Sequence, residues 1–202
     1  MPASSPQGMT LDYYERNAES FFNATIDVDM RPLYRRFLAL LPPKARILDA
    51  GCGAGRDLRA FSELGHRVTA FDASPALAAL AAEYAGQPVA CARFDEIDWR
   101  EAFEGVWACA SLLHVSGTEL PDALRRLACA LVPGGVLYVS FKYGRGEREH
   151  QGRQFTDLDE DALRALLDQV RDLRCIEVWV TGDQRPGRES ERWLNGLLRR
   201  CP

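Results

Sequence analysis

The chain has 202 residues, of which 47% are hydrophobic and 27% charged, a composition typical of one globular domain with a substantial core. Acidic residues outnumber basic ones 29 to 25, and the net charge of −4 offers no bulk positive field for a phosphate backbone, so nucleic acid is an unfavoured partner. Neither a continuous apolar membrane span nor a basic-then-apolar export signal is found, which predicts a cytoplasmic protein without a membrane partner.

The cysteines and histidines do not form a metal-binding or disulfide pattern. The six cysteines are scattered without a C-x-x-C pair, and the three histidines lie far apart in the sequence. A chain of this length needs no disulfide staples, and a metal site needs clustered ligands. We therefore expect buried, reduced thiols and no metal site.

Two helices are predicted near the start of the chain. After a polar tail over residues 1–10, apolar residues recur at three- and four-residue steps over residues 11–24, which predicts a short amphipathic helix. A second apolar face over residues 30–41 predicts another helix, which Asp29 can cap and which Pro42 and Pro43 end.

The pattern changes at residue 46, where short apolar segments begin to alternate with helical stretches. Gly65 is placed to end the first of these helices, and Ser74 followed by proline opens the next. The alternation predicts right-handed βαβ crossovers, a parallel sheet and helices on both of its faces. The expected strands cover residues 46–50, 67–71, 89–93, 106–110 and 136–141.

The last third of the chain continues the alternation. Ser116 or Thr118 is the expected cap of the helix after the fourth strand, and Thr156 is the expected cap of a later leucine-rich helix. Residues 175–181 are typical of a strand, whereas residues 193–200 fit a helix or a strand equally well by periodicity.

The turn after the first strand contains three closely spaced glycines, in the segment Ile-Leu-Asp-Ala-Gly-Cys-Gly-Ala-Gly-Arg-Asp of residues 47–57. Glycines there permit positive φ and close approach of the backbone to a ligand, and open α/β sheets bind ligands at their strand ends. A dinucleotide fingerprint would need glycine at position 56, which is Arg56, so the turn predicts another kind of ligand.

Three carboxylates at successive strand ends indicate what that ligand is. Asp49, two residues before the first glycine, favours a cation over a pyrophosphate. Asp72 closes the second strand, where a carboxylate can accept hydrogen bonds from ribose hydroxyls, and Asp95 after the third strand can accept from an exocyclic amine. A cationic adenine nucleoside with a free amino group is S-adenosylmethionine.

With these motifs the chain resembles the class I S-adenosylmethionine-dependent methyltransferases, of the small bacterial type, over about residues 46–141. The shared elements are the turn of residues 49–55, Asp72, Asp95, the loop Ser111-Leu112-Leu113-His114, and Leu131-Val132-Pro133-Gly134-Gly135 before the fifth strand. The resemblance implies a Rossmann-like three-layer α-β-α sandwich whose mostly parallel sheet has strand order 3-2-1-4-5-7-6. Its seventh strand is antiparallel, which favours a strand over residues 193–200.

The resemblance also implies how the cofactor is held. The glycines would pack against the methionine half, Asp72 would bind the ribose, Asp95 with the backbone of Glu96 would contact the adenine, and Ser111 and Leu112 would lie opposite. The expected cofactor-binding residues are Asn17, Asp49, Gly51, Cys52, Gly53, Gly55, Arg56, Asp72, Ala73, Asp95, Glu96, Ser111 and Leu112. S-adenosylhomocysteine would be the product.

Transfer of an activated methyl requires alignment of the acceptor, exclusion of water and, for a protonated acceptor, a base. The candidate catalytic residues are Tyr13 and Tyr14, on an expected lid helix, and His114 after the fourth strand. Tyr14 could equally seal the sheet edge, and His114 could simply bond to backbone at a helix start.

Three further features keep alternatives open. Arg56 can reach the cofactor carboxylate, although an arginine at a helix N-terminus needs local compensation. The polar loop from Lys142 to residue 153 carries three arginines, which fit a clamp for an anionic acceptor or a mobile solvated loop. Cys52 and Cys109 could hold a metalloid acceptor, but small buried side chains are the favoured interpretation.

These observations predict one domain over residues 1–202, with N-terminal tail and lid helices over 1–43 and a core over 44–202. The expected function is methyl transfer to O, N or S of a small-molecule acceptor by a monomer or homodimer. The alternatives are a methyltransferase acting on RNA or protein, and a non-catalytic S-adenosylmethionine-binding regulator.

Overall fold

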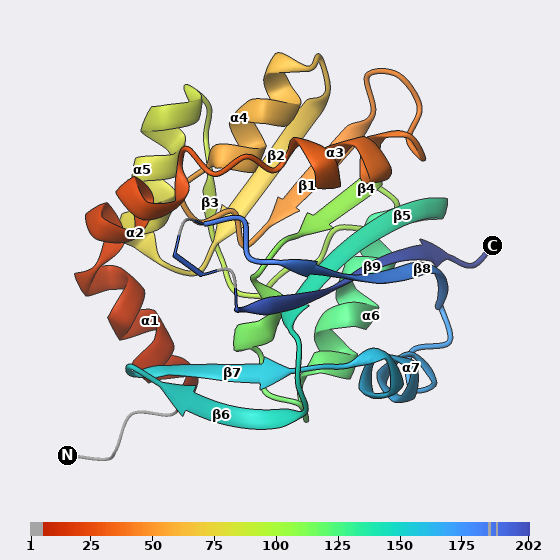
Figure 1. Cartoon of the computed structure of the whole chain (residues 1–202). Helices are drawn as coiled ribbons and strands as arrows, with labels where there is room; N and C mark the ends of the chain where they lie inside the picture. Colours follow the sequence, from red (N-terminus) through yellow and green to blue (C-terminus); the bar gives the residue numbers. More distant parts are fainter. Residues whose placement is uncertain (1–5, 186, 189) are drawn as a thin grey trace.

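The computed structural model describes residues 6–185, 187–188 and 190–202. Its centre is a seven-stranded sheet of order β3-β2-β1-β4-β5-β9-β8, with helices on both faces (Figure 1). Strand β9 runs antiparallel to β5 and β8, and the other pairings between described strands of this sheet are parallel. The strands are β1 (Arg46–Ala50), β2 (Arg67–Asp72), β3 (Ala90–Cys91), β4 (Phe103–Ala108), β5 (Leu131–Lys142), β8 (Leu173–Gly182) and β9 (Arg192–Arg200).

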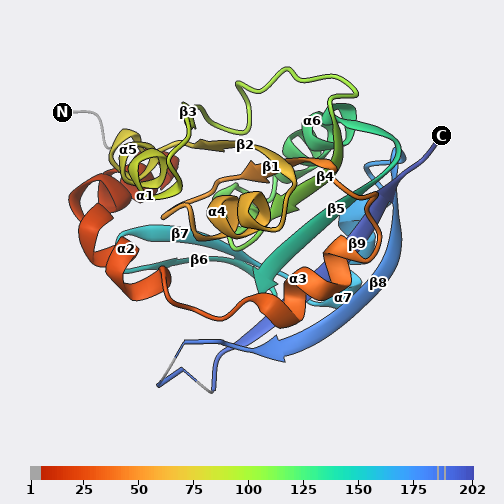
Figure 2. The same ribbon diagram turned by 90° about the horizontal axis from the view of Figure 1, so that it is seen from above.

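This arrangement confirms the expected fold and strand order, because β8 and β9 are the sixth and seventh strands of the main sheet. Strands β6 (Gly146–His150) and β7 (Arg153–Asp157) form a separate two-stranded sheet. Figure 2 shows β8 along one outer edge of the molecule. The helices are α1 (Pro6–Arg16), α2 (Ala18–Thr25), α3 (Arg31–Leu38), α4 (Arg56–Glu63), α5 (Pro75–Ala85), α6 (Leu120–Ala130) and α7 (Glu160–Leu167), with a short 3-10 helix η1 (Leu112–His114).

The period-two alternation of β4 supplies both layers of the core. Val106 and Ala108 pack among the residues of α6 and α7 on one face, whereas Trp107 packs with α3 and α4 on the other. The Trp107 ring stacks on Tyr138 of β5 with centroids 3.9 Å apart. Because α3 buries Phe37 against Trp107, this helix covers the sheet.

The N-terminal helices differ from the expected ones. The predicted single helix over 11–24 is two helices that meet at Asn17, whose side chain donates to the Tyr13 carbonyl at 2.7 Å. Helix α1 also includes residues 6–10, which were expected to be tail, while residues 1–5 of that tail lie outside the described residues. Helix α3 ends at Leu38, earlier than expected, and Asp29 accepts from the Arg31 amide at 3.0 Å.

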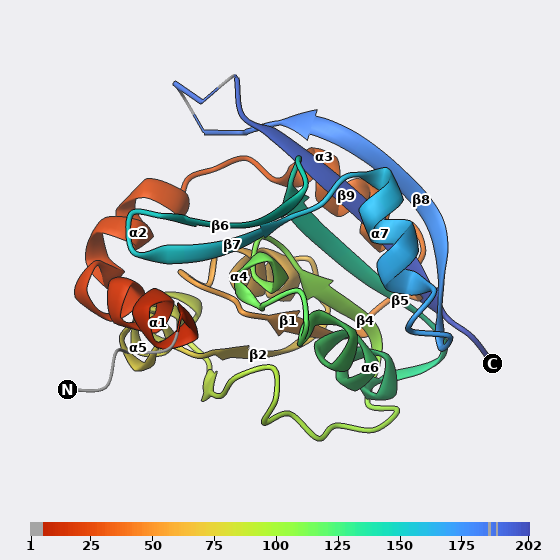
Figure 3. The same cartoon turned by 90° about the horizontal axis from the view of Figure 1, so that it is seen from below.

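The loop expected from Lys142 to residue 153 is instead the end of β5 followed by the β6–β7 hairpin. It turns at Gln151 and Gly152, both of which have positive φ, as a tight hairpin turn requires. Figure 3 shows β7 running from α1 toward α7, and β7 packs along α1 and η1. The hairpin therefore places polar residues of the expected loop next to the N-terminal helix.

Two expected helix caps are wrong. Thr156 lies in β7, where its hydroxyl donates to the Val115 carbonyl at 2.8 Å, and Asp159 caps α7 by accepting from the Ala162 amide at 2.9 Å. The cap residue of α6 is Glu119, where Ser116 or Thr118 was expected. The Glu119 carboxylate accepts a hydrogen bond from the Ser116 hydroxyl at 2.5 Å.

The expectation of buried thiols is also wrong for half of the cysteines. Cys91, Cys129 and Cys175 are exposed, since they lie on the short edge strand β3, the outer face of α6 and the edge strand β8. In the described part of the chain, no helix is long and apolar enough to cross a membrane.

Candidate active site

The glycine turn between β1 and α4 requires glycine for both conformation and space. Gly51, Gly53 and Gly55 have φ of 73°, 53° and 79°. A Cβ on Gly51 would lie 2.5 Å from the Cβ of Ser111, and a Cβ on Gly55 would lie 2.9 Å from the backbone of Ala81 in α5. The turn therefore packs directly against both η1 and α5.

Two cavities meet at this turn. The smaller cavity, about 390 Å³, lies against the ends of β2 and β4 and beside α1. The larger cavity, about 620 Å³, extends toward β5, the β6–β7 hairpin and the connection between β8 and β9. Six residues line both cavities: Tyr14, Phe21, Gly51, Gly53, Ala110 and His114.

Asp72 and Asp95 are among the carboxylates that line the smaller cavity. The Asp72 carboxylate accepts from the Gly53 amide at 2.8 Å and from the Ser74 amide at 2.9 Å. Burial raises the pKa of Asp72, and these amides oppose the rise. Asp95 is more exposed, and its hydrogen-bonded ion pair with Arg93 lowers its pKa.

Beneath the turn, Asp57 of α4 is the centre of a buried hydrogen-bond network. Its carboxylate accepts from Tyr34, from Trp107 Nε1 at 2.7 Å, and from Arg56 at 2.6 and 2.9 Å. Burial opposes ionisation, but Arg56 and the hydrogen bonds bring the pKa of Asp57 below its ordinary value. Asp57 is thus the local compensation that Arg56 needs at the start of the helix.

Asp49 of β1 has an unsatisfied oxygen. Its side chain is 2% exposed, and Oδ2 has no hydrogen-bond partner. Burial, followed by repulsion from Asp57, raises its pKa well above the ordinary value. A buried carboxylate oxygen without a partner next to the glycine turn fits a ligand that carries a positively charged or donating group.

Tyr14 and His114 form a hydrogen-bonded pair at the wall that the two cavities share. The Tyr14 hydroxyl lies 2.8 Å from His114 Nε2, and His114 Nδ1 lies 2.7 Å from the Gln154 carbonyl oxygen. Since a carbonyl can only accept, Nδ1 carries the proton and Nε2 accepts from Tyr14. Burial lowers the pKa of His114 to about 4, so the ring is neutral near pH 7.

The structure brings most of the sequence-predicted site residues together. Those that line the cavities are Tyr14, Gly51, Cys52, Gly53, Arg56, Asp72, Ala73, Asp95, Ser111 and His114. The predicted residues outside both linings are Tyr13, Asn17, Asp49, Gly55, Glu96 and Leu112. Leu112 is fully buried in the core, and the neighbouring Leu113 lines the larger cavity instead.

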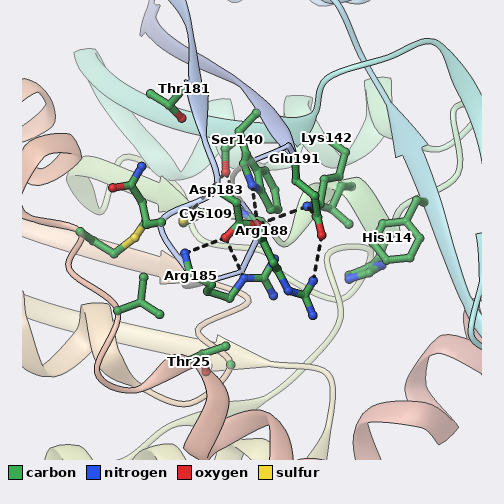
Figure 4. A pocket seen from close by; sticks show the side chains of 18 of the residues that line it. Thr25, Cys109, His114, Ser140, Lys142, Thr181, Asp183, Arg185, Arg188 and Glu191 are labelled. Atoms are coloured by element: carbon green, nitrogen blue, oxygen red, sulfur yellow. Dashed lines mark hydrogen bonds and ion pairs between the residues drawn. The ribbon is translucent and has the colours of Figure 1, made fainter.

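The connection between β8 and β9 also lines the larger cavity, although no sequence motif predicted this. Asp183 in this connection accepts from Arg185 at 2.9 Å and from Trp193 Nε1 at 3.0 Å, and Glu191 pairs with Lys142 (Figure 4). The available signal was a dense mixture of charged residues with Gly and Pro between two apolar segments.

Cys52 and Cys109 both line the larger cavity. Burial raises the pKa of both thiols, that of Cys109 to about 12, so both are protonated near pH 7. Within the described ranges, no group of three or more His, Cys, Asp or Glu is placed to hold a metal ion.

Comparison with known proteins agrees with this geometry. A family model described as a methyltransferase domain matches residues 47–135. The chain is 36% identical to trans-aconitate 2-methyltransferase of Paracidovorax citrulli (strain AAC00-1), with 81% of this chain and 77% of that protein aligned. It is 39% identical over 100 residues to a ubiquinone biosynthesis O-methyltransferase of Bradyrhizobium sp. (strain ORS 278), and the match spans only 39% of that protein's length.

A solved structure is similar over the whole chain. It is 1,6-didemethyltoxoflavin-N1-methyltransferase of Burkholderia thailandensis, solved with 1,6-didemethyltoxoflavin and S-adenosylhomocysteine bound. The TM-score is 0.82 at 25% sequence identity, with 100% of this chain and 93% of that chain covered. The fold, the site and these matches together place the chain among the class I S-adenosylmethionine-dependent methyltransferases. The cofactor of this family is S-adenosylmethionine.

Proposed function

We propose that the protein transfers a methyl group from S-adenosylmethionine to a small-molecule acceptor, with the nucleoside in the smaller cavity and the acceptor in the larger one. The observation that carries this proposal is the wall that the two cavities share at Tyr14, Gly51, Gly53 and His114. The reactive methyl lies between the nucleoside and amino-acid halves of the cofactor, so it would be at this wall. A cavity of about 620 Å³ is of the size that small ligands occupy.

The residues present fit the cofactor. The Asp72 carboxylate, fixed by two backbone amides, retains lone pairs that can accept from ribose hydroxyls. Asp49 lines neither cavity, so its unsatisfied oxygen would act on the cationic half of the ligand only from behind the glycine turn. Gly51 and Gly53 leave room for a close approach at the turn. When bound, the cofactor supplies a methyl group that its sulfonium already activates.

On the acceptor side, the Tyr14–His114 pair orients the reacting atom and excludes water. The bound cofactor would supply the methyl to the acceptor atom, and the electron pair of the broken sulfur–methyl bond would remain on sulfur. For a protonated acceptor, the proton goes to the pair, with His114 Nε2 taking it through the Tyr14 hydroxyl. Since the pKa of His114 is about 4, the pair is a weak base, which suits an acceptor that ionises readily.

In this proposal the helices α1 and α2 form a lid over the cofactor and the acceptor. Tyr14 of α1 and Phe21 of α2 line both cavities, and their rings pack edge to face with centroids 5.1 Å apart. A lid that contacts both ligands would close the site only when cofactor and acceptor are in place. Residues 44–202 together with α3 would then form the core of one domain.

The cofactor assignment is tested by titrating S-adenosylhomocysteine into the protein by calorimetry. Asp72→Ala should weaken binding by about 2–4 kcal/mol, since it removes charge-assisted hydrogen bonds in a desolvated site. Asp98→Ala, which removes an exposed acid that lines neither cavity, should bind as the wild type does. Equal affinity of the Asp72 variant and the wild type would refute the role of Asp72.

The acceptor class is tested with S-adenosylmethionine labelled on its methyl group. The purified protein is incubated with size-fractionated cell extract, and label is expected in the small-molecule fraction. Label recovered in RNA or protein would support a macromolecular acceptor. Tight cofactor binding with no labelled product in any fraction would support a non-catalytic regulator.

A further inference from the structure

The larger cavity has a charge opposite to that of the whole chain. Its described lining contains seven arginine and lysine residues but four aspartate and glutamate residues, whereas the chain as a whole has a net charge of −4. The basic lining residues are Arg56, Lys142, Arg148, Arg153, Arg185, Arg188 and Arg192, and the acidic ones are Asp57, Asp157, Asp183 and Glu191. The cavity therefore attracts anions.

Five of these cations already have a carboxylate partner. The pairs are Arg56–Asp57, Arg148–Asp157, Arg185–Asp183, Lys142–Glu191 and Arg188–Glu191. Arg153 and Arg192 form no ion pair with a carboxylate of the described residues. The guanidinium carbon of Arg192 lies 4.4 Å from the ring centre of Tyr143, the residue that follows β5.

Arg153 is held firmly although it has no counter-ion. Its guanidinium carbon lies 4.3 Å from the ring centre of Tyr13 and 5.2 Å from that of Phe155, so two aromatic rings fix its plane. Its Nε is buried without a hydrogen-bond partner, and its Nη2 has a long contact of 3.3 Å to Gln151. A partly desolvated cation with an unused donor is costly, and a bound anion would offset that cost.

Arg153 also lies next to the expected point of methyl transfer. It precedes Gln154, whose carbonyl accepts from His114. Burial raises the pKa of Tyr14, and the charge of Arg153 and its hydrogen bond to Tyr14 oppose that rise. Burial lowers the pKa of His114, and the charge of Arg153 lowers it further. The ring of Phe155 packs against His114 with centroids 5.0 Å apart, and it lines the same cavity. A fixed cation and an apolar surface are thus adjacent at the Tyr14–His114 pair.

We infer that the methyl acceptor is a small organic anion, whose carboxylate-like group is bound by Arg153 while its apolar part packs on Phe155 and Leu113. This inference rests on the proposed function and names the acceptor class. The planar fork of an arginine can donate two parallel hydrogen bonds to a carboxylate. The anchored end of the acceptor would fix the position of the atom that receives the methyl.

Calorimetry on protein saturated with S-adenosylhomocysteine tests this inference, with benzoate and its neutral analogue benzamide as probes. We expect the wild type to bind benzoate at least tenfold more tightly than benzamide. Arg153→Gln should abolish the preference, and Arg153→Lys should retain part of it because the charge remains. Arg145→Gln, directly before the hairpin, is the matched control: Arg145 is exposed, pairs with Asp159 and Asp161, and lines neither cavity.

The inference is overturned if the wild type shows no preference for benzoate, or if the preference survives Arg153→Gln. It is also overturned if Arg153→Gln weakens S-adenosylhomocysteine binding more than threefold, since Arg153 would then hold the cofactor carboxylate. If that variant does not fold, the wild-type comparison and Arg153→Lys decide. Failure of the wild type to bind S-adenosylhomocysteine would count against the proposed function. In that case the benzoate and benzamide titrations are repeated on cofactor-free protein, and they test the anion site separately.

Discussion

His114 combines a structural and a chemical role because both of its ring nitrogens are used. The Gln154 carbonyl fixes the proton on Nδ1, and the Tyr14 hydroxyl donates to Nε2. Burial lowers the pKa of this ring to about 4 from its ordinary value of about 6.5. The folded protein therefore holds a neutral imidazole across a pH range in which the unfolded chain would take up a proton.

This difference predicts a specific pH dependence of stability. Between about pH 6.5 and pH 4 the unfolded state binds more protons, so the free energy of unfolding falls as the pH decreases, by at most about 3 kcal/mol from this residue. Denaturant unfolding across this range should show a smaller loss of stability for His114→Gln than for the wild type. An identical pH dependence for His114→Gln and the wild type would contradict the buried neutral state.

At the level of single residues, the sequence predicts site residues best at strand ends, where the turn geometry or the ligand requires one residue type. Gly51, Gly53 and Asp72 follow from strand-end motifs, and the structure places all three at the cavities. Leu112 and Asn17 were expected there but lie outside, because the phase of a short 3-10 helix and the break between α1 and α2 decide which side chains turn inward. Such phases depend on tertiary packing, which a sequence pattern does not contain.

The packing of α4 against α5 depends on Gly55, which has positive φ and a backbone contact with Ala81. Gly55→Ala should destabilise the protein by about 3 kcal/mol, because a left-handed alanine is strained and its Cβ has no room. Gly65, at the other end of α4, also has positive φ, but nothing lies within 4 Å of its added Cβ.

Gly65→Ala is therefore the matched control, with an expected loss of about 1 kcal/mol from conformation alone. Urea unfolding of both variants measures the difference, which isolates the steric part of the Gly55 requirement. If the two substitutions cost the same, the contact between the turn and α5 contributes nothing to stability.

Elements with a clear hydrophobic period were predictable, whereas those built from charged residues were not. The alternation of β1, β2 and β5 with helices predicted a parallel sheet, and the resemblance to a known family was needed to assign β9 as a strand. The β6–β7 hairpin contains Arg148 and Arg153 among other polar residues, and five exposed residues of β6 give no apolar alternation. The pairing of its two strands and its packing along α1 and η1, which the sequence pattern does not contain, define this segment.

Across the whole molecule, cofactor binding should appear as added stability. A ligand that binds only the folded state at 100 times its dissociation constant adds about 2.7 kcal/mol to the free energy of unfolding. For a chain of this size, that corresponds to a rise in Tm of about 5–10 °C. Thermal unfolding with S-adenosylhomocysteine measures this shift.

Asp72→Ala provides the comparison at the same S-adenosylhomocysteine concentration. Its Tm should rise much less, because the ligand no longer saturates the variant. Equal shifts for the two proteins would mean that the ligand stabilises the fold without using the smaller cavity.

The contacts of α1 determine how the site can open. Thr10 accepts from the Gln154 amide at 2.9 Å, and one helical turn later Tyr14 bonds to His114, so α1 is joined to both β7 and η1. Since Tyr14 belongs to the wall between the cavities, α1 cannot move away without exposing both at once. Movement of α1 away from β7 and η1 would thus open both cavities in one step.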